Sequence, residues 1–383
     1  MNNEKTNGTE TQKRVTFAAI NPYTESHIVA PVQEKAAGSD MVRWGKANAY
    51  PQYLAELYDN VTTLHTIIDG DADFTAGDDV LLAPGEDGKF RDGIMDRKGT
   101  TASQQVHDLA HDLDLYGGFA LQVIRDKAGR PAELVHLPFE RLRSDADNQC
   151  FWYSEKWGTR KVGATAKAVV YPKFLPGLEY ARLTPEEQAR HAASILYVKR
   201  DNGRTYPSPI FAAAIKACET ERCTDTYHLN AINNNFEGSV MVNFNNGKPS
   251  DEIMEQVEAD FTEKYTGFQN ALRVIFSWND SKETATTVTP MVTRDFGEKY
   301  RALSEHCRQQ IYTAFRAVPS LFGLPTASGF STEEYEEAFK LYNRTRIQPM
   351  QRTIIDAYAK VLGPGRVTIV PFSLSGSGED TIK

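Results

Sequence analysis

The sequence predicts an α+β protein whose first half mixes helices with short strands and whose second half is dominated by long helices. In the first half, apolar residues at three- and four-residue spacing give way to short runs in which apolar and polar residues alternate. In the second half, three long stretches keep the helical spacing, and a small unit with strand-like patterns separates the first two. The sequence contains no internal repeat and no low-complexity tract.

The composition is that of an ordinary globular chain. Its 383 residues, 40% hydrophobic and 25% charged, suffice for two or three compact units. Lys+Arg 43 against Asp+Glu 51 gives a net charge of -8, which argues against a protein whose main task is to grip nucleic-acid phosphates. The four cysteines form no C-x-x-C pair, the N-terminus lacks a signal-peptide pattern, and no apolar run approaches the roughly 18 residues of a membrane span. We therefore expect a soluble protein of a reducing cytosol, with no membrane partner.

The first half is predicted to start with a flexible arm over residues 1–40, which is polar and interrupted by two prolines. Apolar residues three and four apart then predict a helix over residues 51–68, punctuated by Gly70 and Gly77. The same spacing predicts a second helix over residues 101–115. Alternating apolar residues predict four strands, at 119–123 and 134–137 as a hairpin with a turn at 126–129, and at 169–171 and 195–198.

The second half is predicted to contain two long helices that flank a small βαβ unit. Helical spacing covers residues 207–235 and residues 296–318. The first of these ranges opens with Pro207 and Pro209, because prolines can start a helix but cannot lie within one. Between them, the pattern predicts a strand over 239–244, a helix over 250–265 and a strand over 272–278. The unit is therefore expected to form a compact insertion between the helices.

A third long helix is predicted to begin at residue 331, because Ser331 and Glu334 have the S-x-x-E spacing of a capping box. Pro349 is expected to bend this helix, and an apolar strand over residues 367–372 follows. Residues 319–331 contain two prolines and two glycines, which preclude a core helix. This segment is therefore predicted to be a loop between the second and third helices.

One motif suggests a zinc site but is incomplete. His107 and His111 lie one helical turn apart, as in the H-E-x-x-H zinc motif, with Asp108 at the position of the glutamate. No downstream motif supplies a third ligand, and a shorter carboxylate reaches a metal-bound water less well. The alternative interpretation is a solvated helix face beside the apolar stripe.

The other candidate motifs are weaker still. Asp69, Asp71 and Asp73 begin like a calcium-binding loop, but the positions that need Gly and a bidentate Glu hold other residues, so we interpret them as an exposed acidic turn. Cys218 and Cys223 have neither zinc nor redox spacing and are expected to be core or interface residues. The sequence contains no nucleophile elbow, P-loop or dinucleotide fingerprint. We therefore expect no enzyme activity, no metal and no cofactor.

The strongest local pattern is IYTAFRAVPSLFGL at residues 311–324, in which a helix ends at Val-Pro and Leu-x-Gly follows, with the capped helix after it. Weaker patterns precede it at residues 50–58, 67–70, 115–121, 137–143 and 206–209. Taken in order over residues 44–362, these segments resemble the portal proteins of tailed bacteriophages. The likeness depends on this order, because each motif alone is modest.

The resemblance implies a portal-type fold with named parts. The α+β wing corresponds to residues 41–206, and the crown is reduced because the chain ends soon after Gly363. The remaining parts are a first stem helix at 207–237, a clip at 238–294, a second stem helix at 295–318, a tunnel loop at 319–331, a long bent helix with a closing wing strand at 332–375, and a flexible tail at 376–383.

The resemblance also implies a function and partners. Portal proteins form a ring of about twelve copies at one capsid vertex, a closed cyclic assembly. Double-stranded DNA passes through the channel during packaging and ejection. The large terminase subunit docks on the clip, a neck or adaptor protein follows it, and the major capsid protein and scaffold surround the ring, which is assembled in the bacterial host cytoplasm and remains in the virion. The implied terminase contacts are Lys248, Glu255 and Glu263, and the implied DNA contacts are Pro325, Thr326, Ala327, Ser328, Gly329 and Phe330.

Two alternatives from other classes stay open on the residues alone. The first alternative is a phage or bacterial scaffold protein that forms no DNA channel, and the three long helices taken alone also fit a plain helical bundle core. A zinc-dependent hydrolase would use His107 and His111. An acidic subunit suits a channel, because a passage for DNA must not hold its phosphates tightly.

Overall fold

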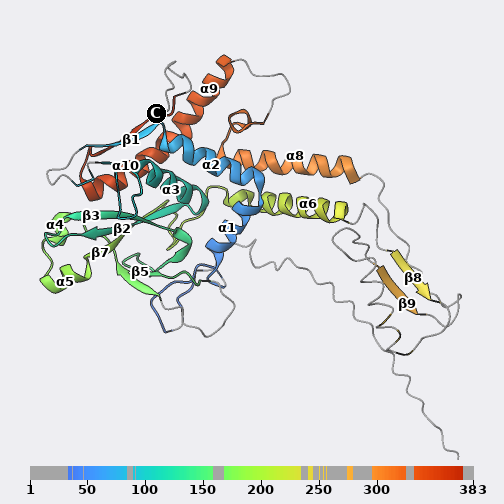
Figure 1. Cartoon of the computed structure of the whole chain (residues 1–383), viewed down its shortest axis with the longest axis horizontal. Helices are drawn as coiled ribbons and strands as arrows, with labels where there is room; N and C mark the ends of the chain where they lie inside the picture. The colour runs from blue at the N-terminus through green and yellow to red at the C-terminus, as the bar shows by residue number, and fades with distance from the viewer. Residues whose placement is uncertain are drawn as a thin grey trace, which may run out of the picture.

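The protein combines helices and strands in one body, from which a pair of long helices extends (Figure 1). The computed structural model describes residues 33–83, 89–157, 168–233, 240–244, 274–278, 296–324 and 332–373, apart from 37, 46 and 91, together with the single residues 250, 253 and 256. The predicted mixed α and β class is confirmed. The predicted flexible arm lies almost wholly outside the described residues, as does the tail.

The central sheet has three antiparallel strands in the order β3-β2-β7. These are β2 (Gly118–Arg125), β3 (Pro131–Leu137) and β7 (Ala193–Lys199). Leu121 lies opposite His136 in β3 and Leu196 in β7, so the predicted hairpin and the predicted strand at 195–198 are confirmed. Ala120 of β2 lies in one hydrophobic core and Phe119 and Leu121 lie in another, so both faces of this strand are buried.

Helices cover one face of this sheet (Figure 1). The predicted helix at 101–115 is α3 (Ala102–Leu115), which begins at a capping box between Thr101 and Gln104. Val106 and Leu109 of α3 pack with Phe119 and Leu121 of β2 and with Ile354 of α10 (Gln348–Leu362). The spacing of apolar residues predicted this helix correctly because the apolar stripe of α3 is the face that packs in the core.

The helix predicted over 51–68 is wrong in its bounds. The chain forms α1 (Tyr50–Asn60) and α2 (Thr62–Ala76), separated by Val61, which is extended at φ -120 and ψ 101 and fully buried. Gly70 does not punctuate a helix but lies within α2, whereas Gly77 does end it, at φ 68. Tertiary packing against α2, described below, explains the glycine inside the helix.

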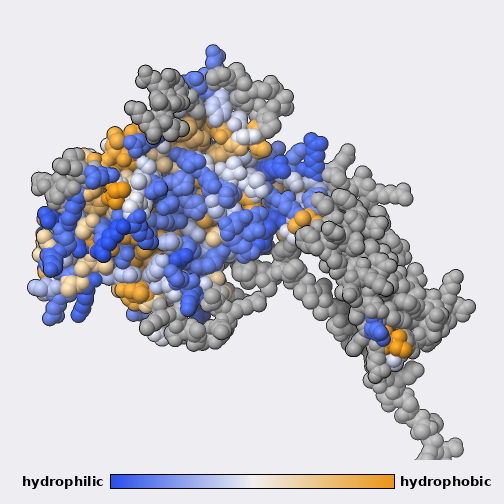
Figure 2. Space-filling model, in the orientation of Figure 1, coloured by the Kyte–Doolittle hydropathy of each residue, from blue (hydrophilic) through white to orange (hydrophobic). Residues whose placement is uncertain are grey.

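Two further sheets complete the body. The second is antiparallel in the order β4-β5-β6, formed by β4 (Leu142–Ser144), β5 (Cys150–Tyr153) and β6 (Val169–Pro172), and β6 confirms the strand predicted at 169–171. β1 (Asp79–Leu82) pairs with β10 (Val367–Val370), which confirms the predicted closing strand and brings the segment after α2 next to the C-terminal strand. Figure 2 shows a mainly hydrophilic face with apolar residues gathered near β1.

The two long helices lie side by side. They are α6 (Ile215–Asn233), preceded by the short η2 (Ala212–Ala214), and α8 (Phe296–Phe315). The first helix was predicted to start at residue 207, and this start is wrong. Residues that precede a proline avoid the helical region of the backbone, so Tyr206 and Ser208 do not start a helix. The chain here also packs closely on Gly117: a Cβ at Gly117 would lie 2.3 Å from the Ser208 carbonyl oxygen.

The insertion between the long helices has two described strands, β8 (Val240–Phe244) and β9 (Val274–Trp278). They pair in parallel with Val242 opposite Phe276, as a βαβ unit requires. The helix predicted at 250–265 lies outside the described residues except for three isolated positions. Within the part of the chain that the structure describes, no helix is long and apolar enough to cross a membrane.

The third long helix is bent, as predicted. It comprises α9 (Thr332–Tyr342), the π-helical turn η5 (Asn343–Ile347) and α10, and Figure 1 shows α9 and α10 running in different directions. Pro349 lies in the first turn of α10 and has no N–H to donate, so the wider π turn precedes it. Ser331, the predicted cap, lies outside the described residues.

Candidate functional site

The predicted contact residues lie outside the part of the chain that the structure describes. This holds for both sets, Lys248, Glu255 and Glu263 of the insertion and Pro325, Thr326, Ala327, Ser328, Gly329 and Phe330 of the loop. The structure does describe residues 316–324, which include the first six residues of the predicted loop, and α9 after it, and we call these two segments the flanks. The candidate site is therefore the mounting that fixes the two ends of this loop to the body.

The upstream flank ends α8 abruptly. The helix stops at Phe315, short of the predicted Val318, because Arg316 adopts a left-handed conformation at φ 57. For a residue other than glycine this conformation costs about 1 kcal/mol or more. A short turn, η4 (Pro319–Phe322), follows and ends at Gly323, also left-handed at φ 78.

An aromatic cluster holds both flanks against α2. We call it the aromatic anchor, and its members are Phe74, Phe322, Phe339, Tyr342 and Phe372. The ring centroids of Phe74 lie 6.1 Å from Phe322 of the upstream flank and 5.4 Å from Phe339 of α9, in edge-on geometry. Both ends of the loop therefore rest on one side chain of α2.

Gly70 is the reason that Phe322 can reach α2. A Cβ at Gly70 would lie 2.6 Å from Cε1 of Phe322, closer than any ordinary contact. The helix gains nothing from a glycine in its interior, where alanine is favoured by about 1 kcal/mol. The glycine is therefore explained by packing.

Gly70→Ala is expected to lower the free energy of unfolding, because an overpacking cost of about 1–3 kcal/mol opposes the smaller gain in helix propensity. Urea unfolding at fixed protein concentration measures it. Gly177→Ala is the matched control, since nothing lies within 4 Å of a Cβ at Gly177. A Gly70→Ala protein more stable than the wild type would show that Phe322 is not held there.

Beneath the aromatic anchor lies a buried cluster of charges from four elements. Arg346 of η5 donates from Nε to Asp71 Oδ2 at 3.1 Å and from Nη2 to Asp114 Oδ1. Arg200 donates to the same Asp114 oxygen at 3.1 Å, and Tyr342 donates its hydroxyl to Asp71. Both carboxylates are fully buried. This charge cluster joins α2, α3, the end of β7 and the π turn.

The electrostatics of the charge cluster follow from burial and from the pairing. Burial and then the neighbouring Asp114 raise the pKa of Asp71 well above its ordinary value, while Arg346 opposes this. Burial alone would lower the pKa of Arg346, but Asp114 and Asp71 outweigh burial and raise it. The guanidinium therefore stays charged and is the group that keeps two buried carboxylates tolerable.

A cavity of about 420 Å³ opens beside the charge cluster. We call it the arginine pocket, because Arg200, Arg316 and Arg346 line it together with Thr345 and Thr353. Its apolar lining includes Leu113, Ile210, Ala314, Pro349 and Met350. The pocket thus lies where the start of the first long helix, the end of the second and the π turn meet.

A family model described as phage portal protein matches residues 97–376, which is well over half of the chain. The chain belongs to the phage portal protein family. Its function is that of a portal at the head-to-tail connection of a virion. No curated protein matches the sequence significantly.

Solved structures resemble this portal protein in fold. A chain from the virion of the native gene transfer agent (GTA) particle matches with a TM-score of 0.53 and 16% identity, covering 84% of this chain and 83% of that chain. A chain from the neck of the empty GTA particle, computed with C6 symmetry, gives 0.53 and 15% over 86% and 85%. One from the neck of the native GTA particle, computed with C12 symmetry, gives 0.51 and 16% over 84% and 84%.

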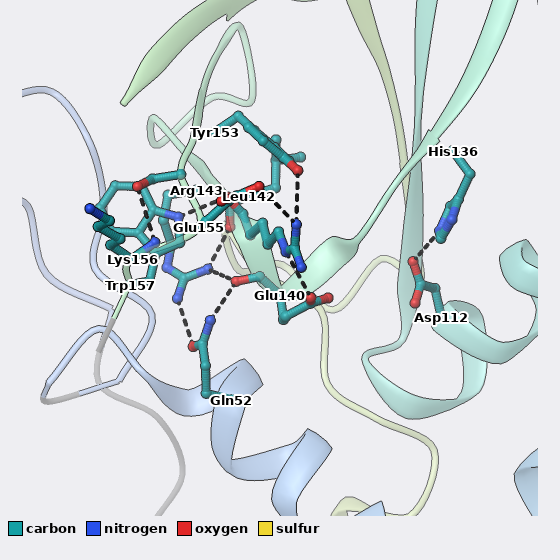
Figure 3. Close-up of polar contacts among 12 residues, drawn as sticks. Gln52, Asp112, His136, Glu140, Leu142, Arg143, Tyr153, Glu155, Lys156 and Trp157 are labelled. Carbon is teal, nitrogen blue, oxygen red and sulfur yellow. Dashed lines mark hydrogen bonds and ion pairs between the residues drawn. The ribbon is translucent and has the colours of Figure 1, made fainter. Parts of the chain in front are cut away.

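A second structural centre joins the body of the portal protein to its first long helix. Arg143 of β4 is fully buried and donates from Nη1 to the carbonyl oxygens of Glu140 and Leu142, and from Nε and Nη2 to Asn48. Figure 3 shows its guanidinium between Gln52 of α1 and the Glu140 backbone. Burial lowers the pKa of Arg143 to about 10, so the group is still charged at neutral pH.

Aromatic stacking extends this centre to Tyr206, the last residue before the proline pair. The rings of Trp44 and Tyr206 stack with centroids 4.3 Å apart, and the Arg143 guanidinium lies 5.9 Å from the Trp44 ring. The Tyr206 hydroxyl donates to the Val42 carbonyl and accepts from the Ser144 N–H at 2.8 Å. The start of the first long helix is thereby fixed to the body.

The two histidines of the zinc hypothesis have other neighbours. His107 faces Asp73 and Asp108 at 3.5 and 3.7 Å, and His111 lies beside Asp112 and edge-on to Tyr58. His136, which was not predicted, is the better-paired imidazole: it lies 2.7 Å from Asp112, a pair that Figure 3 also draws. Among the described residues, no group of three or more His, Cys, Asp or Glu side chains is placed to hold a metal.

The acidic turn predicted at Asp69, Asp71 and Asp73 is wrong. These residues lie inside α2, and Asp71 is buried in the charge cluster because Arg346 and Tyr342 pair with it. Cys218 is a buried core residue as predicted, and burial raises the pKa of its thiol. No sequence signal identified Asp71 or Arg346 as partners, since 275 positions separate them.

Proposed function

We propose that this portal protein forms a closed ring of about twelve subunits whose central channel passes double-stranded DNA during packaging and ejection. The family match, which spans both long helices and the loop between α8 and α9, is the observation that carries the proposal. The fold likeness to a chain in a GTA neck computed with C12 symmetry supports the subunit number. The acidic net charge of -8 suits a passage that must not retain phosphates.

In this proposal α6 and α8 are the stem helices, with the wing before them and the clip inserted between them. Their packing supports the assignment: the rings of Tyr227 and Tyr300 stack 5.0 Å apart between the two helices. Phe211 and Phe315 stack 5.7 Å apart at the other end of the pair. A pair fastened at both places is stiff enough to line a channel.

The tunnel loop, residues 319–331, is proposed to face the channel axis through Pro325, Thr326, Ala327, Ser328, Gly329 and Phe330. Small and neutral side chains at the tip allow brief contacts with DNA, whereas a basic cluster would hold it. The aromatic anchor and the charge cluster support this role, because they fix the described residues on both sides of the tip to α2.

The proposed partners follow the parts of the molecule. The large terminase subunit docks on the clip, with Lys248, Glu255 and Glu263 as contacts, and a neck or adaptor protein later replaces it. The major capsid protein and scaffold surround the ring, which assembles in the host cytoplasm and stays in the virion. The protein itself acts without catalysis, because terminase supplies the ATP hydrolysis.

Imaging tests the ring. Purified full-length protein, alone or with capsid protein, should give closed rings with a central hole in negative-stain micrographs and should hydrolyse no ATP. A stable monomer at micromolar concentration under both conditions would contradict the proposal. A compact oligomer without a hole would favour the scaffold alternative instead.

Replacing Thr326–Gly329 with lysines tests the tunnel loop. Rings should still assemble, because the anchor residues are unchanged, but DNA packaged into assembled heads should fall at least tenfold as the lysines grip phosphates. The DNA content of purified heads measures the effect. Lysines at Glu179, Glu186, Ala189 and Arg190, all exposed on two short helices of the wing, are the control. Normal packaging with the loop lysines would reduce the loop to a simple connector.

A further inference from the structure

The arginine pocket offers more positive charge than the described residues of its own subunit neutralise. Its described lining contains three guanidinium groups and no carboxylate. Arg200 and Arg346 are paired with Asp71 and Asp114 of the charge cluster. Arg316, the third, is exposed and forms no ion pair with any residue that the structure describes.

The backbone at Arg316 strengthens the case that its side chain has a role in an assembly. Its φ of 57 lies in the left-handed region that glycine adopts most easily. A strained residue with a long charged side chain persists where that side chain makes a useful contact. Within one subunit, the described residues provide no anionic partner for it.

An acidic stripe lies on α9 of the same chain. Glu333, Glu337 and Leu341 are spaced four residues apart, so they lie along one face of the helix. All three are exposed, Leu341 by 63%, and the two carboxylates pair with no residue that the structure describes. Glu333 lies in the first turn of α9, where the helix dipole favours a carboxylate, whereas Glu337 lies one turn further on and is repelled by Glu333. Figure 1 shows α9 extending from the body.

We infer that the acidic stripe of one subunit docks in the arginine pocket of the next subunit in the ring. The carboxylates of Glu333 and Glu337 would meet the free guanidinium of Arg316, and Leu341 would cover part of the apolar lining. One surface extends from the body and the other is hollow, so the contact is heterologous, as a closed cyclic assembly requires. The inference rests on the proposed function, because it needs a ring.

Charge reversal in the full-length protein tests the contact. Arg316→Glu, and separately the double change Glu333→Arg with Glu337→Arg, should each raise the protein concentration needed for half-maximal ring formation at least tenfold, as measured by mass photometry. Combining all three changes should restore most of the assembly, because the charges then match again. Arg352→Glu on the exposed face of α10 is the matched control and should stay within about twofold of the wild type.

Arg316→Gly separates assembly from folding. Glycine accepts the left-handed backbone, so this variant should unfold at the same or a higher temperature than the wild type and yet assemble poorly. Unchanged ring formation by Arg316→Glu and Arg316→Gly would overturn the contact, and so would a triple variant no better than the single reversals. Intact rings with reduced DNA retention would show that the pocket faces DNA instead. Wild-type protein that forms no rings would overturn the proposed function as well.

Discussion

Arg346→Met is expected to lower the free energy of unfolding by about 3–5 kcal/mol, the usual cost of removing one partner from a buried ion pair. The methionine fills much of the space, but Asp71 and Asp114 are left fully buried without their shared cation. Urea unfolding at fixed protein concentration measures the loss. Arg344→Met, two positions away on the exposed side of the same π turn, should cost less than about 1 kcal/mol.

The loss caused by Arg346→Met should also depend on pH. Asp71 already has a raised pKa in the folded protein, and without the guanidinium that opposes the effect, its pKa rises further. A carboxyl with a raised folded pKa is stabilising below its unfolded value, about 3.9, and this contribution is lost as the pH rises through the folded value. The variant should therefore be closest to the wild type in acid and furthest from it above neutrality. Equal losses at pH 5 and pH 8 would show that the carboxylates are not the cause.

Local sequence patterns correctly predicted those helices and strands whose apolar residues also face the tertiary core. The helix at 101–115 and the hairpin around β2 were found because their apolar faces are the faces that the core covers. The helix at 51–68 was drawn wrongly because Gly70 looks like a breaker, and only its contact with Phe322 explains it. The start of the first long helix was missed for a similar reason, since the chain around Pro207 packs against Gly117.

The candidate site was less accessible to sequence reasoning. The loop is predicted from its prolines, glycines and flanking motifs and lies largely outside the described residues, whereas its mounting is made of contacts between distant positions. Phe74 packs against Phe322 and Phe339, and Asp71 pairs with Arg346. A single sequence shows no periodic pattern that would identify such pairs of distant residues. A partner for a buried charge can be deduced only once the fold brings the two together.

The contacts at both flanks lead to the body of the subunit. Pro319 and the left-handed residues Arg316 and Gly323 end helical hydrogen bonding after α8. The aromatic anchor and the charge cluster hold the described flanks through α2, an element of the body. In the proposed tunnel-loop role, force from moving DNA would therefore be carried to the body of the subunit.

Arg143→Met is expected to lower the free energy of unfolding by about 3 kcal/mol, because buried acceptors without a donor cost about 1–3 kcal/mol each and several lose theirs. The carbonyl oxygens of Asn48 and Leu142 would lose a bond to this guanidinium, and that of Glu140 would keep only the bond from Gln52 Nε2 at 2.8 Å. Arg143→Lys should recover only part of the loss, since one ammonium group cannot span acceptors on α1, β4 and the preceding turn.

The readout that identifies Arg143 as a junction is the fluorescence of Trp44, which stacks on Tyr206 and lies beside the guanidinium. In Arg143→Met, this tryptophan should become accessible to a quencher at denaturant concentrations where the rest of the body is still folded. Arg141→Met is the matched control: Arg141 lies two positions away, and its ion pair with Glu155 at 3.2 Å is exposed and worth less than about 1 kcal/mol. If both variants lowered the free energy of unfolding by the same amount, the buried hydrogen bonds of Arg143 would contribute no more than an exposed ion pair. If Trp44 stayed protected until global unfolding, the first long helix would be fixed to the body by other contacts.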